Sequence, residues 1–200
     1  GYVDPEITYR SLGIQFAYTG IDMGSSFGNS IHDTNQSSIF TNLVYNSIIG
    51  NINNKIKTGI SISYDEYDEY VNNLGFNDFD ISRIEKSVGA YFEYSYDNSD
   101  KINLSAGIRF DNHNKIGNFI SPRFHMNYMV LPKSTIKFSF GKATRPANIF
   151  SENQKLFYSS REIIFTENSL PTDFSSMKAD QAWNYGVSII NSFKLSLIHI

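Results

Sequence analysis

The sequence contains no cysteine. This absence excludes disulfide frameworks, thiolate zinc sites and cysteine nucleophiles. Positive and negative charges nearly balance, with a formal net charge of -3 and a pI of about 5.8. The chain therefore lacks the basic character of proteins that bind nucleic acid. Apolar runs of about 18 residues, which a transmembrane helix needs, are also missing.

Aromatic residues, in contrast, are plentiful. They make up 15% of the chain, with 16 Phe and 13 Tyr, although the mean hydropathy is only -0.31. Serine and asparagine together account for roughly a quarter of the residues, well above ordinary usage. A chain that is polar on average but rich in aromatics is typical of transmembrane β-strands, in which lipid-facing and lumen-facing side chains alternate.

The strongest pattern along the chain is an alternation with period two. In Lys101–Asp111, apolar residues from Ile102 to Phe110 alternate with polar residues from Asn103 to Asp111. Because successive strand side chains point to opposite faces, such a segment has one apolar and one polar face. Similar segments span residues 7–18, 38–49, 55–65, 87–97, 119–131, 135–141 and 183–193. The sequence therefore predicts an all-β fold of about eight antiparallel strands, each near the 9–11 residues that cross a bilayer.

The connections between these segments form a second pattern. Tight turns are expected at 51–54, 97–100 and 131–134, which are rich in turn-forming residues. Longer links are expected at 19–36, 66–83, 112–118 and 143–181. Short periplasmic turns alternating with long extracellular loops are typical of barrels in the bacterial outer membrane. We therefore expect the chain to lie in that membrane, in contact with its lipid.

Five motifs between Lys101 and Phe193 resemble the barrel of TonB-dependent outer-membrane receptors, particularly the branch common in Bacteroidetes. They are Gly107-Ile-Arg-Phe-Asp-Asn-His-Asn114, Ser121-Pro-Arg-Phe124, Gly141-Lys-Ala-Thr-Arg-Pro-Ala-Asn-Ile-Phe-Ser-Glu-Asn153, Ser159-Ser-Arg161 and Ala182-Trp-Asn-Tyr-Gly186. Their order and spacing carry the resemblance, which covers nearly half of the chain. The first half fits only by the rhythm of its strands.

The resemblance implies a barrel of about 22 strands with a plugged lumen. It also implies energised uptake of a scarce nutrient, powered through the TonB complex by way of a plug domain. We expect residues 1–200 to be a partial transmembrane barrel domain without that plug, and a fragment of a gene or expressed segment. The expected partners are TonB, an unknown small-molecule or glycan ligand, and a surface lipoprotein.

A group of charged and imidazole side chains is predicted to face the lumen: Arg109, Asp111, His113, Arg123 and His125. Opposite charges on neighbouring strands can pair across the sheet. One reading is a site that contacts the plug or the substrate. The other, which we favour, is a charge network that fills a lumen already polar by construction.

The long link 143–181 is the best candidate for ligand contact, because loops on a rigid scaffold often carry recognition. Its candidate residues are Arg145, Asn148, Glu152, Asn153 and Arg161. The alternative is that Arg145 and Glu152 pair with each other and order the loop. The sequence favours neither reading.

Two further groups have structural interpretations. The acidic run Asp65–Tyr70 has no calcium-loop spacing and is expected to be a solvated loop tip. Four aromatic residues near strand ends are expected to form an interfacial girdle rather than a sugar-stacking site. They are Tyr94, Tyr96, Trp183 and Tyr185.

Nothing in the sequence indicates catalysis. Gly24-Ser-Ser-Phe-Gly28 lacks the strand–turn–helix context of a nucleophile elbow. The four histidines lack metal-ligand spacing. We therefore expect no enzyme activity, no cofactor and no metal site. Two alternatives to the receptor remain, namely a complete eight-stranded structural or adhesion barrel and a soluble carbohydrate-binding β-sandwich.

Overall fold

The computed structural model describes residues 9–28, 30–72, 79–98, 101–147 and 178–192. Eight strands account for almost all of them: β1 (Ser11–Phe27), β2 (Ser30–Ile48), β3 (Asn54–Asn72), β4 (Phe79–Asn98), β5 (Ile102–His113), β6 (Gly117–Leu131), β7 (Ser134–Arg145) and β8 (Asp180–Asn191). None of the described ranges forms a helix with the length and apolar character of a membrane-spanning helix.

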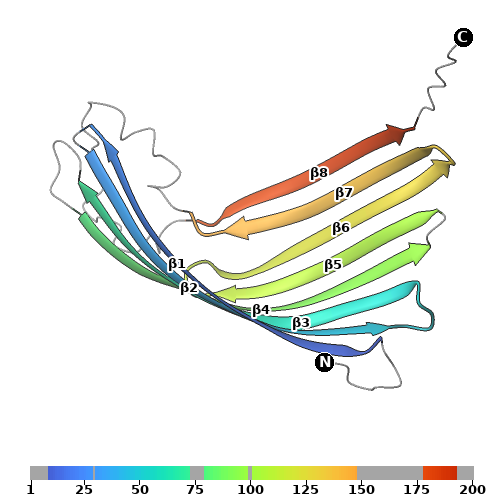
Figure 1. Ribbon diagram of the computed structural model, residues 1–200, viewed down its shortest axis with the longest axis horizontal. Coiled ribbons are helices and arrows are strands. Elements are labelled where there is room, and N and C mark those ends of the chain that lie inside the picture. The colour runs from blue at the N-terminus through green and yellow to red at the C-terminus, as the bar shows by residue number, and fades with distance from the viewer. Residues whose placement is uncertain (1–8, 29, 73–78, 99–100, 148–177, 193–200) are drawn as a thin grey trace, which may run out of the picture.

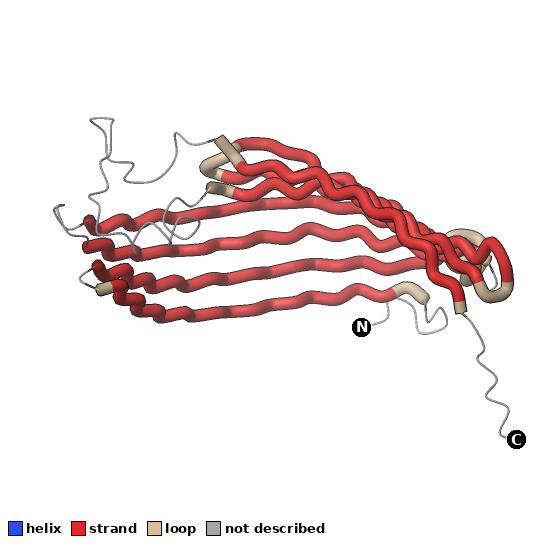
Figure 2. Tube along the Cα trace, turned by 90° about the horizontal axis from the view of Figure 1, so that it is seen from above, coloured by secondary structure: helices blue, strands red, loops and turns tan. Residues whose placement is uncertain are grey.

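The strands form one sheet in sequence order, from β1 to β8, with every neighbouring pair antiparallel. The sheet is twisted and curved, and β1 and β8 lie at its two edges (Figures 1 and 2). A β-sandwich needs a second sheet packed on the first, and the described strands form only one. A closed eight-stranded barrel needs β1 to pair with β8, and these two strands do not pair.

Burial in this sheet is inverted relative to a soluble protein. Among the described residues only two apolar side chains, Val71 and Ile81, are buried. The polar and charged side chains that are buried form a longer set: Ser30, His32, Asn42, Ser47, Ser61, Glu69, Arg83, Asp111 and His113. Soluble domains bury apolar groups and keep charges exposed. This sheet is therefore built for apolar surroundings on one side.

The apolar face forms a continuous belt across the sheet. Its members include Ile14, Ile60, Phe92, Ile108 and Val187, and the exposed fraction reaches 73% at Ile14 and 70% at Val187. An exposed apolar surface of this extent needs a partner. Because the belt crosses every strand rather than forming a local patch, a lipid bilayer is the partner that fits it.

All eight predicted strands are present, but β1 to β4 and β7 are each longer than predicted by five residues or more. The predicted links 19–36 and 66–83 are mostly strand, since β1 continues to Phe27 and β3 to Asn72. The acidic run Asp65–Tyr70 consequently lies within β3 and not at a loop tip. Backbone pairing continues beyond the apolar belt, where most residues on both faces are polar and the alternation that marks a strand is weak.

The turns are also shorter than predicted at two places. β1 and β2 are separated by two residues, and Gly28 there has a φ of 65°. β5 and β6 are joined by residues 114–116, followed by Gly117 with a φ of 73°. Glycine tolerates this left-handed conformation, which tight hairpins require. The expected link 112–118 is therefore a tight turn, and the strict alternation of short and long connections is wrong.

Candidate functional site on the polar face

The polar face gathers most of the charged side chains of the strands. Arg109 lies opposite Tyr91, and Tyr91 lies opposite Gly59, so these residues share one row and one face. Two residues further along, Asp111, Gly89, Ser61 and Asn42 form the next row. Polar side chains from β2, β3, β4 and β5 thus lie close together on this face, because the register aligns them.

Arg109 and Asp111 form the best-defined ion pair on the polar face. Arg109 Nε donates to both carboxylate oxygens of Asp111, at 2.9 and 2.8 Å, and Nη2 donates to Oδ1 at 2.6 Å. Nη2 also donates to Ser61 Oγ at 2.6 Å. The Asp111 side chain is only 5% exposed and that of Arg109 is 28% exposed. The pair therefore holds the guanidinium in one orientation at the edge of solvent.

Two glycines leave the space that these side chains occupy. A Cβ on Gly89 would lie 2.5 Å from Arg109 Nη2 and closer still to Asp111. A Cβ on Gly59 would lie 2.5 Å from the hydroxyl of Tyr91. Any other residue at these positions would displace the groups opposite, so the glycines are required by close approach across the sheet.

A second polar connection runs from β4 to β1. The Tyr91 hydroxyl donates to Asn42 Oδ1 at 3.2 Å, and Asn42 Nδ2 donates to Gln15 Oε1 at 2.9 Å. The Arg109 guanidinium lies 6.0 Å from the centre of the Tyr91 ring. Tyr91 therefore links the Arg109–Asp111 pair to the amides of the neighbouring strands.

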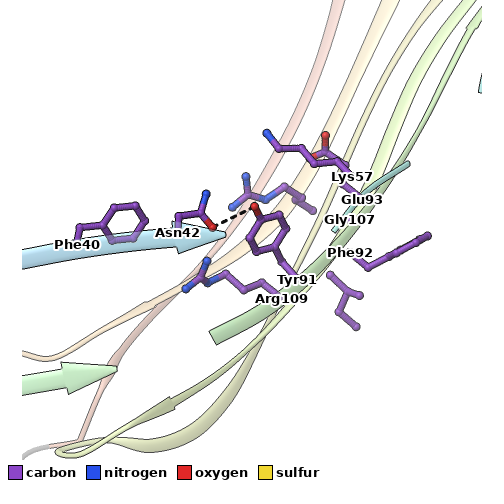
Figure 3. A pocket seen from close by; sticks show the side chains of 10 residues that line it. Phe40, Asn42, Lys57, Tyr91, Phe92, Glu93, Gly107 and Arg109 are labelled. Carbon is purple, nitrogen blue, oxygen red and sulfur yellow. Dashed lines mark hydrogen bonds between the residues drawn. The ribbon is translucent and has the colours of Figure 1, made fainter. Parts of the chain in front are cut away.

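These groups border a pocket of about 230 Å³ on the polar face. Figure 3 shows the Tyr91–Asn42 bond beside Arg109, with Lys57 and Glu93 at the same site, while Phe92 extends away from them. Arg123 also lines the pocket. Asp111 neutralises Arg109, but Lys57 and Arg123 together still exceed Glu93, so the pocket keeps a positive charge. It can hold an anionic or hydrogen-bonding group.

Farther along the same face, five ionisable side chains from β2 to β5 form a network, which we call the Arg83 network. Its members are His32, Glu69, Arg83, Glu85 and His113. At its centre Arg83 Nη1 donates to Glu69 Oε1 at 2.5 Å, and Arg83 Nε donates to Glu85 Oε1 at 3.0 Å. The outer oxygen of each carboxylate lies 3.8 Å from a histidine Nε2, that of His32 for Glu69 and that of His113 for Glu85. The Arg83 guanidinium thus partly neutralises two carboxylates, of which Glu69 is 3% exposed and Glu85 15% exposed.

Tyr67 packs against the Arg83 network, with the centre of its ring 4.0 Å from the Arg83 guanidinium. Glu66 and Asp68 flank it on the other face of β3, so this part of the strand lies outside the apolar belt. Burial, and then the negative charge of Glu85, raise the pKa of Tyr67 to about 12. The phenol therefore stays protonated to a higher pH than an ordinary tyrosine, and its oxygen accepts a hydrogen bond from Gln36 Nε2.

The predicted lumen group lies on one face, but the structure does not join all of its members. Arg109 pairs with Asp111. His113 lies near Glu85, and Arg123 borders the pocket. His125 is opposite Ser105 on the same face. Among the described residues, no group of three or more His, Asp or Glu side chains could hold a metal ion.

Of the predicted loop residues, the structure places only Arg145. Its Nη2 lies 3.4 Å from Asp180 Oδ2, and both side chains are exposed. Asn148, Glu152, Asn153 and Arg161 lie outside the described residues, so both readings of the loop, ligand contact and a pairing of Arg145 with Glu152, stay predictions.

Sequence reasoning missed the Arg83 network and the contact between Tyr91 and Asn42. Glu69, Arg83 and His32 lay in segments predicted to be loops. The available signal was a weak period two, since Arg83 and Glu85 are two residues apart and share a face. Asn42 carried no signal, because its partner Tyr91 is 49 residues away.

Comparison with solved structures identifies the sheet. The chain is similar to FpvAI in its complex with pyocin S2, with a TM-score of 0.56 and 11% identity, over 89% of this chain and 27% of that one. It is also similar to the copper transporter OprC, with a TM-score of 0.56 and 12% identity, over 89% and 32%. At this identity the similarity concerns the fold. The chain spans less than a third of the length of either structure.

No curated protein matches the chain. Residues 3–196 match the family model described as TonB dependent receptor-like, beta-barrel. That match covers nearly the whole sequence, including the first half, where only strand rhythm had supported the resemblance. The family consists of transporters of the bacterial outer membrane and not of enzymes. The chain therefore belongs to the TonB-dependent receptors, and its eight strands form part of their outer-membrane β-barrel.

Proposed function

We propose that the protein takes up a scarce nutrient across the outer membrane, driven by TonB, and that these strands form part of the wall of a plugged barrel of about 22 strands. The observation that carries the proposal is the family match over residues 3–196, on a sheet with a lipid-facing belt and a buried polar face. The branch of the family common in Bacteroidetes is also part of the proposal and rests on the five sequence motifs.

In this proposal the polar face lines the lumen. Arg109, Asp111, His113, Arg123 and His125 form part of that lining. The low exposure of Asp111 and the hydrogen bonds of Arg109 support a mainly structural role for this pair. Arg123 differs, because its side chain is exposed and forms no hydrogen bond or ion pair among the described residues. It is the member of the group best able to contact a plug or a solute.

The ligand is proposed to contact the link between β7 and β8, through Arg145, Asn148, Glu152, Asn153 and Arg161. Support comes from its length in a sheet whose other described connections are tight. A surface lipoprotein that covers this loop is a further proposed partner.

The test is growth of a strain that lacks the gene, under limitation for iron chelates, cobalamin or a glycan in turn. We expect a defect on one nutrient, restored by the complete reading frame only where TonB is present. Restoration without TonB, or normal growth on every nutrient, would refute energised uptake.

The role of the loop is tested in the same strain with residues 153–172 deleted. If the loop recognises the ligand, the deleted receptor still inserts into the membrane but no longer restores growth. Growth equal to that with the intact receptor would exclude recognition by this segment. The matched control is the variant Lys137→Gln, which removes one charge from the polar face of β7 without altering the loop.

A further inference from the structure

Some charged side chains in the middle of the polar face have no partner within the sheet. One row across the sheet consists of Lys57 on β3, Glu93 on β4, Gly107 on β5 and Arg123 on β6. The three charged residues of this row all border the pocket of about 230 Å³. Within the described part of the chain none of the three forms a hydrogen bond or an ion pair, although Lys57 and Glu93 are directly opposite each other. Their charged groups can therefore bind something that enters the pocket.

Glycine keeps the space around Arg123 open. Gly107 and Gly141 are its two neighbours in the row. A Cβ on Gly107 would lie 3.3 Å from Cγ and 3.7 Å from Cδ of Arg123, so the stem of this arginine lies over Gly107, on the side of the pocket. A glycine inside a strand often marks a place where a ligand approaches closely. Here it lets a long cationic side chain extend along the floor of a pocket.

The net charge of the pocket indicates the charge of its ligand. Asp111 neutralises Arg109, which leaves Lys57 and Arg123 against Glu93 alone. One positive charge therefore remains uncompensated. A carboxylate carries one negative charge at neutral pH, whereas a phosphate monoester carries about -1.5 to -2. A single carboxylate thus balances the pocket more closely than a phosphate does.

The donors of the pocket also suit a carboxylate. The hydroxyl of Tyr91 already donates to Asn42, so the main donors left for a ligand are the guanidinium of Arg123 and the ammonium of Lys57. A guanidinium can bind both oxygens of a carboxylate through two parallel N–H groups, and an ammonium adds a second charged donor. We propose that this pocket is a binding site for one carboxylate group, held by Arg123 and Lys57.

The pocket lies in the wall of the barrel and not at its outer end. Its lining includes Phe92 and Ile108, two members of the apolar belt, so it is at the depth of the bilayer. It is therefore separate from the proposed ligand contact in the link between β7 and β8. The carboxylate belongs either to a solute in the lumen or to an acidic side chain from another part of the complete protein. Only the first source rests on the proposed uptake.

The experiment uses the protein made from its complete reading frame, purified in an uncharged detergent, and follows binding by fluorine NMR. Fluoroacetate is the probe, and fluoroethanol is its uncharged counterpart. For a solute site we expect saturable binding of fluoroacetate but not of fluoroethanol. Lys57→Gln/Arg123→Gln should weaken this binding at least about tenfold, because it removes the two charged donors. Arg123→Lys keeps the charge and should weaken binding less than Arg123→Gln does, which separates loss of charge from misfolding.

The matched control is Lys55→Gln/Lys137→Gln, which removes the same charge from the polar face outside the pocket. This variant should bind fluoroacetate as the wild type does. Equal binding by the wild type and Lys57→Gln/Arg123→Gln would overturn the proposal. Equal weakening in the control, or an effect of Arg123→Lys as large as that of Arg123→Gln, would also overturn it.

A second measurement identifies an internal source of the carboxylate. If an acidic side chain of the complete protein fills the pocket, fluoroacetate does not bind, and a carbodiimide couples Lys57 to that side chain. Mass spectrometry of the digested protein then finds Lys57 joined to an acidic residue other than Glu93, its neighbour in the row. Absence of both fluoroacetate binding and such a coupling would overturn the site. Both measurements use purified protein, so their results do not depend on whether the growth test supports uptake.

Discussion

A charge placed in the middle of the apolar belt gives the sharpest test of the inverted sheet. Ile14 and Tyr18 lie four residues apart on β1, on the same face, and are 73% and 65% exposed. On the surface of a soluble protein, replacing either would change stability by about 0.5 kcal/mol or less. In a bilayer the two positions differ in depth, because Tyr18 shares the row of Lys86 at the edge of the belt while Ile14 is near its centre.

We therefore expect Ile14→Arg to lower the free energy of unfolding by about 2–4 kcal/mol and Tyr18→Arg to lower it by no more than about 1 kcal/mol. The assay is equilibrium unfolding in urea of the complete protein in phospholipid vesicles, followed by tryptophan fluorescence and by heat-modifiable migration on gels. Equal effects of the two substitutions, both within about 0.5 kcal/mol of the wild type, would refute a lipid-facing belt.

Three further predictions concern the polar face and use the same unfolding assay. Asp111→Ala leaves the Arg109 guanidinium without its main acceptor and should cost about 1–3 kcal/mol, with part of the loss recovered in Arg109→Met/Asp111→Ala; no recovery would mean that the ion pair is not the cause. Gly89→Ala forces a Cβ against Asp111 and Arg109 and should cost about 1–3 kcal/mol; a neutral result would contradict the close approach seen here. The pKa of Tyr67 is raised from 10.0 to about 12 in the folded protein, so its contribution to stability is complete below pH 10 and is lost as the pH rises to 12. Tyr67→Phe should lose less stability than the wild type between these pH values, and equal slopes would contradict the shift.

The sequence was sufficient to predict the strands that cross the membrane. Between Ile102 and Phe110, for example, every second residue is apolar. The structure places these residues on the apolar face, where Ile108 and Phe110 are 52% and 49% exposed. Such a pattern is readable because lipid and lumen impose opposite demands on neighbouring residues. The same reasoning placed Trp183 and Tyr185 on the apolar face, where they lie 48% and 71% exposed.

The segments of β1 to β4 that extend beyond the apolar belt could not be predicted in this way. Beyond Tyr64 most residues on both faces of β3 are polar, with Val71 as an aliphatic exception near the end of the strand, so period two is only a weak signal there. What holds this region together is backbone pairing and long-range contact, such as Arg83 with Glu69 across 14 residues and Tyr91 with Asn42 across 49. Single-sequence patterns report local amphipathicity and do not report which polar side chains meet.

The four long strands give the sheet an uneven upper edge. His113, near the top of β5, shares a row with Ala17 on β1, and β1 continues for another ten residues to Phe27 (Figure 1). At about 3.3 Å per residue the β1–β2 hairpin rises about 30 Å along the strand beyond the β5–β6 turn. We therefore expect this hairpin to extend well above the bilayer surface on the cell. An antibody, a bacteriophage or a protease would reach it well before the low turn at residues 114–116, so we expect this part of the sequence to be under the strongest pressure to vary.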